Sequence, residues 1–149
     1  MSNSHVQLYQ ATSSGNLEQV QRILRGGLDC SINWLHSRQL TSTEETALHA
    51  ACRNGYAAII QELLQYKADI NYKDSSQWSP IHHASFYGRS EALRVLVAHP
   101  QVNINATTYF NCTALYLAAC EKRLSCVQVL LDAKPDTSIP GKDNFFSVC

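Results

Sequence analysis

Three histidines and two cysteines are the residues of this chain whose types could carry chemistry. His49, His82 and His83 are potential metal ligands, and Cys52 or Cys126 beside a histidine could resemble the nucleophile of a thiol enzyme. A zinc site needs three or four converging ligands, and a thiol enzyme needs a third group that orients the base. The sequence has no C-x-x-C pair, no Gly-rich phosphate loop and no G-x-S-x-G turn. We therefore predict no catalytic residue, no metal and no cofactor.

The elements that hold these side chains are predicted by an internal repeat. The same pattern of a hydroxyl residue, apolar residues and paired small residues recurs at residues 46–51, 79–84 and 113–118. Leu48, Ile81 and Leu115 fill the same slot and are spaced by 33 and 34 residues. A period of this length is typical of stacked helical units. The function is therefore expected in a surface rather than in a catalytic pocket.

Each unit has the pattern of two helices joined by a tight turn. In the second unit, apolar residues spaced three and four apart predict one helix through Leu48 and Cys52 and another from Ile59 to Leu64. Helix starts are marked by side chains that can cap a first turn, and Pro80 suits the first helical position. These caps are Thr46, Ser79 and Thr113.

The turn between the two helices carries a glycine in three units. Gly15, Gly55 and Gly88 share this slot, where glycine adopts a positive φ without a Cβ clash. The fourth unit has Lys122 there instead. We predict a strain of about 1 kcal/mol at that turn, or a different turn shape.

The repeated pattern resembles the ankyrin repeat, with its T-P-L-H-x-A-A helix start, turn glycine, L-L helix and A-D-V-N hairpin. The matching residues are Ser79-Pro80-Ile81-His82, Leu63-Leu64, Ala68-Asp69-Ile70-Asn71, Leu130-Leu131 and Pro135-Asp136. The likeness extends from about Val6 to Asp136. It implies an all-α ankyrin-repeat solenoid of about four helix-turn-helix units, whose inner helices and projecting loops line a concave face.

We predict one domain over residues 1–149, divided into units at roughly 5–33, 46–73, 79–105 and 113–138. A long loop, residues 32–45, lies between the first two units, since loops accept insertions more easily than helices. Residues 139–149 resemble the beginning of a fifth repeat. They fit a piece of a longer array, a splice product or a last loop that folds back as a cap.

The resemblance also implies a structural role for two of the histidines. The histidine of T-P-L-H ties a helix to the adjacent loop, and His49 and His82 occupy that position. His83 stands where the family usually has an apolar residue, and we expect it to be partly buried or to face the groove. We expect histidines of successive repeats to lie too far apart to share a metal ion.

Composition and charge narrow the class of partner. The 12 basic and 12 acidic residues cancel, which disfavours nucleic acid and anionic membranes. No stretch resembles a secretion signal or a membrane span. We therefore expect a protein of the cytoplasm or nucleus that is not secreted, with no membrane insertion and no small-molecule substrate.

By resemblance, partner contacts come from the loop before T-P-L-H and from the two positions before the turn glycine. Several of these slots hold aromatic residues, the type that dominates binding hot spots, although loop aromatics also pack on neighbouring loops. The predicted contacts, including a tryptophan in the long loop, are Trp34, Arg53, Asn54, Trp78, Phe86, Tyr87, Tyr109, Phe110 and Glu121. We expect the aromatic members from Trp78 to Phe110 to cluster on one side of the groove.

The leading hypothesis is a non-enzymatic scaffold or adaptor that binds another protein. Alternatives are the substrate-recognition segment of a ubiquitin-ligase adaptor whose C-terminal box is absent here, a structural stretch of a longer scaffold, and a thiol or metal-dependent enzyme. The resemblance also makes Asn71 a candidate for asparaginyl hydroxylation. Closing the hairpin turn by hydrogen bonding is the other role open to that side chain.

Overall fold

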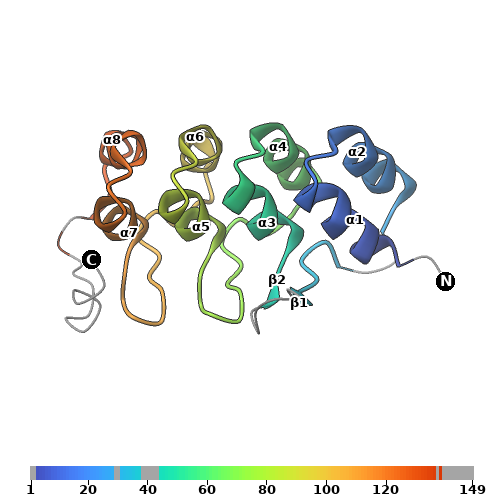
Figure 1. Cartoon of the computed structure of the whole chain (residues 1–149), viewed down its shortest axis with the longest axis horizontal. Helices are drawn as coiled ribbons and strands as arrows, with labels where there is room; N and C mark the ends of the chain where they lie inside the picture. Colours follow the sequence, from blue (N-terminus) through green and yellow to red (C-terminus); the bar gives the residue numbers. More distant parts are fainter. Residues whose placement is uncertain (1–2, 29–30, 38–43, 137, 139–149) are drawn as a thin grey trace.

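The computed structural model describes residues 3–28, 31–37, 44–136 and 138, and in this part of the chain eight helices stand in two rows (Figure 1). The inner row comprises α1 (Ser4–Ser13), α3 (Ala47–Asn54), α5 (Pro80–Phe86) and α7 (Ala114–Cys120). The outer row comprises α2 (Leu17–Gly26), α4 (Ala57–Gln65), α6 (Ser90–Ala98) and α8 (Leu124–Asp132). Each helix contacts its partner within a pair and the matching helix of the next pair. The predicted all-α solenoid is confirmed.

The helix starts follow the predicted caps. The Thr46 hydroxyl accepts from the backbone N–H of His49, and the Thr113 hydroxyl accepts from that of Tyr116. Pro80 is the first residue of α5, where its missing N–H leaves no hydrogen bond unmade.

A single apolar core runs along the stack between the two rows. Its members come from every helix pair, so no pair buries its apolar stripe alone. The largest fully buried apolar side chains are Leu8, Leu48, Ile59, Ile60, Leu63, Ile81, Leu93, Leu96, Leu117 and Leu130. Stacking against a neighbour is therefore what stabilises each repeat.

Two constraints require glycine at these turns: a positive φ and the close approach of a side chain from the following repeat. Gly88 has φ +71°, and a Cβ there would lie 2.8 Å from Cδ of Arg123. Arg123 crosses that turn because its Nε donates to the Phe86 carbonyl at 3.2 Å. Lys122 also has a positive φ, 55°, so of the two predicted alternatives the left-handed turn is the one present, and its side chain is exposed.

A row of asparagine side chains joins the hairpins that follow the outer helices. In three successive hairpins, an asparagine Oδ1 accepts the backbone N–H of the next hairpin at 2.7 to 2.9 Å. The donor and acceptor pairs are Asp69 to Asn33, Asn103 to Asn71, and Asp136 to Asn105. These bonds link the hairpins of neighbouring repeats to one another.

The long loop contains a short β-hairpin that the sequence did not predict. Strand β1 (His36–Ser37) pairs with β2 (Glu44–Glu45) in antiparallel register. The loop packs on α1 through rings, with Trp34 against His5 at 4.8 Å and His36 stacked on Tyr9 at 4.6 Å. The predicted tail, residues 139–149, lies outside the described residues. None of the helices described here is long and apolar enough to cross a membrane.

The two kinds of turn predict opposite effects of substitution. Gly88→Ala should lower the free energy of unfolding by about 1 to 2 kcal/mol, because the new Cβ is strained and displaces Arg123. Lys122→Gly should raise it by about 1 kcal/mol, because the strained φ then carries no Cβ. Urea unfolding followed by circular dichroism measures both; a destabilised Lys122→Gly variant would contradict this explanation.

Candidate functional site

His49 and His82 tie each inner helix to the loop of the following repeat. His49 Nε2 lies 3.0 Å from the Trp78 carbonyl oxygen, and His82 Nε2 lies 2.9 Å from that of Ala106. On the other side of each ring, Nδ1 accepts the backbone N–H of the cap residue, Thr46 or Ser79. The structural role that the resemblance implied for both histidines is confirmed.

Burial decides the charge of these two rings. Both are fully buried, and burial lowers the pKa of His49 and of His82 to about 4. Both imidazoles are therefore neutral at neutral pH. This fits an Nδ1 that accepts from the cap and an Nε2–H that donates to the next loop.

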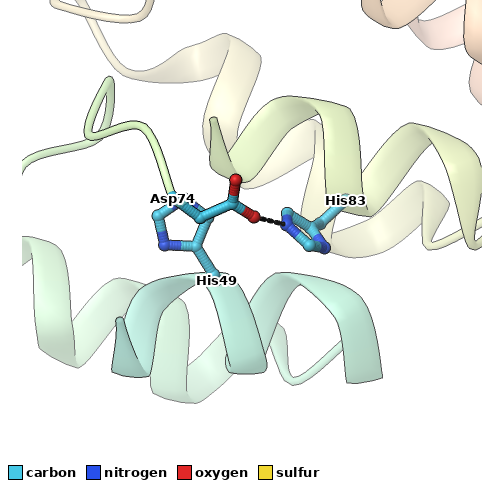
Figure 2. A group of neighbouring side chains, drawn as sticks. All are labelled: His49, Asp74 and His83. Atoms are coloured by element: carbon cyan, nitrogen blue, oxygen red, sulfur yellow. Dashed lines mark hydrogen bonds and ion pairs between the residues drawn. The ribbon is translucent and has the colours of Figure 1, made fainter. Parts of the chain in front are cut away.

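A second polar group joins the loop before α5 to the third histidine. Figure 2 shows Asp74 between the rings of His49 and His83, and its Oδ2 lies 2.8 Å from His83 Nε2. Its Oδ1 accepts the backbone N–H groups of Ser76 and Trp78 at 2.9 and 2.8 Å. Burial alone would raise the pKa of Asp74, but the hydrogen bonds from His83 and Trp78 outweigh it, so the pKa is lowered. The carboxylate thus fixes the loop that presents Trp78.

The expected separation of histidines in successive repeats is wrong for one pair. The ring centroids of His49 and His83 are 5.3 Å apart, because His83 stands one residue beyond His82 and so points roughly 100° further around α5, toward α3. With Asp74, the potential ligand atoms of the three residues lie within 4.8 Å of one another. However, both nitrogens of His49 are already hydrogen-bonded. A metal ion bound to His49 would have to break one of these two hydrogen bonds, so we assign these residues a hydrogen-bonding role.

The two cysteines considered as nucleophiles are packed in the core. Cys52 and Cys126 are both fully buried, and burial raises the pKa of each thiol. A thiol of raised pKa supplies little thiolate for attack on a substrate. Their environment is that of small apolar side chains.

Aromatic side chains meet on the inner side of the stack. We call Trp78, His83, Phe86 and Tyr87 the Trp78 cluster. The Trp78 ring lies 5.3 Å from the rings of both His83 and Phe86, and Phe86 lies 5.2 Å from Tyr87. Trp78, Phe86 and Tyr87 are each partly exposed. The cluster is thus anchored on its buried side by a histidine and open on the other.

Two further aromatic residues occupy the next projecting loop. Tyr109 and Phe110 are 70% and 45% exposed, and their rings lie 5.3 Å apart. They form an aromatic pair on the loop that follows the loop of Trp78. That the aromatic residues from Trp78 to Phe110 cluster on one side of the groove stays a prediction.

An ion pair that the sequence did not single out joins the first two repeats. The carboxylate of Glu45, which is 1% exposed, accepts from Arg53 Nη2 and from the Tyr9 hydroxyl, both at 2.7 Å. Burial would raise the pKa of Glu45, but these two hydrogen bonds lower it overall. Beside it, the Asn54 amide reaches the Ser13 carbonyl at 3.4 Å. Arg53 and Asn54 therefore shape the surface through contacts within the protein.

Comparison with known proteins matches this architecture. The family model described as ankyrin repeats (3 copies) matches residues 8–108 and 78–140. The chain belongs to the ankyrin-repeat family. Ankyrin repeats are protein-interaction modules and are generally non-enzymatic.

Individual relatives share parts of the repeat region. Protein phosphatase 1 regulatory subunit 12A of Mus musculus is 38% identical over 69 residues, which is 43% of this chain and 7% of that protein. Ankyrin repeat and SOCS box protein 3 of Bos taurus is 35% identical over 88 residues, 58% of this chain and 17% of that protein. Human ankyrin repeat and SOCS box protein 2 is 28% identical over 120 residues, which is 78% of this chain and 19% of that protein. The chain thus spans less than a fifth of these relatives.

The side chain of Asn71 is hydrogen-bonded to the hairpin of the next repeat. Its Nδ2 donates to the Gln101 carbonyl at 2.7 Å, and its Oδ1 accepts from the Asn103 N–H at 2.8 Å. Both bonds go to the next hairpin, whereas within its own turn the backbone N–H of Asn71 donates to Asp69 Oδ1 at 2.9 Å. The Asn71 side chain therefore joins two repeats rather than closing its own turn. Hydroxylation of Asn71 stays a prediction.

The neutral histidines predict how stability depends on pH. Because the folded pKa of His82 is about 4 against 6.5 in the unfolded chain, its full contribution to stability is present above pH 6.5. That contribution falls as the pH drops toward 4, by a few kcal/mol for a shift of this size. His82→Gln should be less stable at pH 7.5 but should lose less between pH 6.5 and 4.5. Urea unfolding at several pH values tests this; equal losses in both proteins would contradict it.

Proposed function

We propose that this chain is a non-enzymatic scaffold or adaptor module that binds a partner protein through its concave face and projecting loops. The observation that carries the proposal is the Trp78 cluster. In it, the Trp78 ring packs against the rings of His83 and Phe86 and stays partly exposed to solvent. Central aromatic residues in desolvated contacts supply most of the binding energy in many interfaces. Tyr109 and Phe110 on the next loop extend the aromatic surface.

The loops that carry these rings are already ordered by internal hydrogen bonds. The backbone N–H of Trp78 donates to the Asp74 carboxylate, and its carbonyl accepts a hydrogen bond from His49. Lys73 Nζ donates to the Thr107 carbonyl at 2.8 Å, which links this loop to the next one. Because the face is preorganised, a partner need not supply the free energy of ordering these loops.

The proposed contacts are Trp34, Arg53, Asn54, Trp78, Phe86, Tyr87, Tyr109, Phe110 and Glu121. The guanidinium of Arg53 is paired with Glu45, so we assign it to the shape of the surface rather than to a free charge. The balanced charge favours a protein partner over nucleic acid, and the proposal places the chain in the cytoplasm or nucleus.

The names of several relatives favour a second candidate function. Two of the matched proteins are named as ankyrin repeat and SOCS box proteins. The chain would then be the substrate-recognition segment of a ubiquitin-ligase adaptor. Detecting a longer transcript that continues past Cys149 into such a box would favour this candidate over the simple scaffold.

Truncating the two aromatic groups should weaken partner binding without unfolding the stack. The double variant Trp78→Ala and Tyr109→Ala should lose about 2 kcal/mol or more of binding free energy, because the partly exposed Trp78 and the exposed Tyr109 are the proposed aromatic anchors. Quantitative pull-down mass spectrometry with the wild type and the variant measures the loss.

Tyr66→Ala is the matched control, because Tyr66 is an exposed aromatic residue at the end of the outer helix α4. It should retain the partners that the double variant loses, and all three proteins should give the same helical circular dichroism. Retention of every partner by a folded double variant would show that the assigned face is wrong.

A further inference from the structure

A pocket lies beside the long loop, and no member of the Trp78 cluster is among its lining residues. Its volume is about 510 Å³. The residues that line it are Ser31, Asn33, Trp34, Leu35, Glu44 and Tyr72. It therefore joins the long loop of the first repeat to the strand and the hairpin of the second.

Two aromatic residues, Trp34 and Tyr72, are among those that line this pocket. Trp34 is 49% exposed, and the ring of His5, which does not line the pocket, packs against it at 4.8 Å. Tyr72, in the second hairpin, is the other aromatic residue of the lining. The face of an aromatic ring carries partial negative charge.

Two hydrogen bonds fix the loop segment that carries Trp34. The backbone N–H of Trp34 donates to the Ser31 carbonyl at 3.1 Å, and Asn33 Oδ1 accepts the backbone N–H of Asp69 at 2.9 Å. The second of these bonds belongs to the asparagine row that joins neighbouring hairpins. The pocket is therefore a built feature of the junction between repeats.

The carboxylate of Glu44 gives the pocket its charge. The backbone of Glu44 is fixed by Ser75, whose hydroxyl accepts its N–H at 2.7 Å and whose N–H donates to its carbonyl at 3.1 Å. Within the part of the chain that the structure describes, the Glu44 carboxylate makes no hydrogen bond or ion pair. The adjacent Glu45 is neutralised by Arg53 and turned inward. An exposed carboxylate beside two aromatic rings is complementary to an organic cation.

We propose that this pocket binds an arginine side chain of a partner protein. A guanidinium is planar, so it can stack on the Trp34 ring while its N–H groups pair with the carboxylate of Glu44. The carboxylate of Glu44 would repel an anionic group such as a phosphate, and a neutral side chain would form no ion pair with it. The pocket uses Trp34 but no member of the Trp78 cluster, so this proposal and the proposed function can fail separately.

The test is an NMR titration with the peptide acetyl-Gly-Gly-Arg-Gly-Gly-amide and its citrulline counterpart, which has the same shape without the charge. The indole N–H signals are assigned with the variants Trp34→Phe and Trp78→Phe. The arginine peptide should shift the Trp34 indole signal and leave that of Trp78 in place. The dissociation constant should be in the range of tens of millimolar, because an exposed cation–π contact and an exposed ion pair are both weak. The citrulline peptide should bind about fivefold more weakly or not at all.

Glu44→Gln should weaken arginine binding about threefold, since it removes the ion pair and keeps the shape. Glu91→Gln removes an exposed carboxylate from the outer helix α6 and should have no effect. The proposal is overturned if the Trp34 signal does not move, if the citrulline peptide binds equally well, or if Glu44→Gln and Glu91→Gln behave alike.

Discussion

The hydrogen bond from a buried imidazole to a carbonyl of the next repeat is the interaction on which the rest of the structure depends. His49 and His82 make it at successive junctions, with Trp78 and Ala106 as acceptors. Breaking it would leave a buried donor and a loop carbonyl unpaired, each at a cost of about 1 to 3 kcal/mol. Because no helix pair buries its core face alone, the spacing that these bonds fix determines whether the stack closes.

The same bonds connect the scaffold to the proposed binding surface. The carbonyl that His49 holds belongs to Trp78, whose N–H is held by Asp74 and whose ring rests on His83. The loop that presents the aromatic face is therefore ordered by residues of two repeats. A change in the packing of α3 against α5 would reach Trp78 through these contacts. In this protein the position of the surface depends directly on the interface between repeats.

Sequence patterns predicted what is local and periodic, and missed what depends on pairing across the chain. Caps and turns follow from residue type alone, so Thr46, Gly88 and the positive φ of Lys122 could be predicted. Which of Glu44 and Glu45 points inward depends on the register of a two-residue strand, because one step reverses the side. The contact of His49 with His83 depends on the direction in which α5 faces, and the row of asparagines joins residues more than 30 positions apart.

The most direct test of the central claim, that the concave face and its loops bind the partner, is photo-crosslinking from defined positions. A benzophenone amino acid is placed at position 109, in the projecting loop, or at position 66, at the end of α4. Crosslinks to a discrete partner from position 109 and none from position 66 are the result expected. Crosslinks to that partner from position 66 alone would contradict the assignment and place binding on the outer helices.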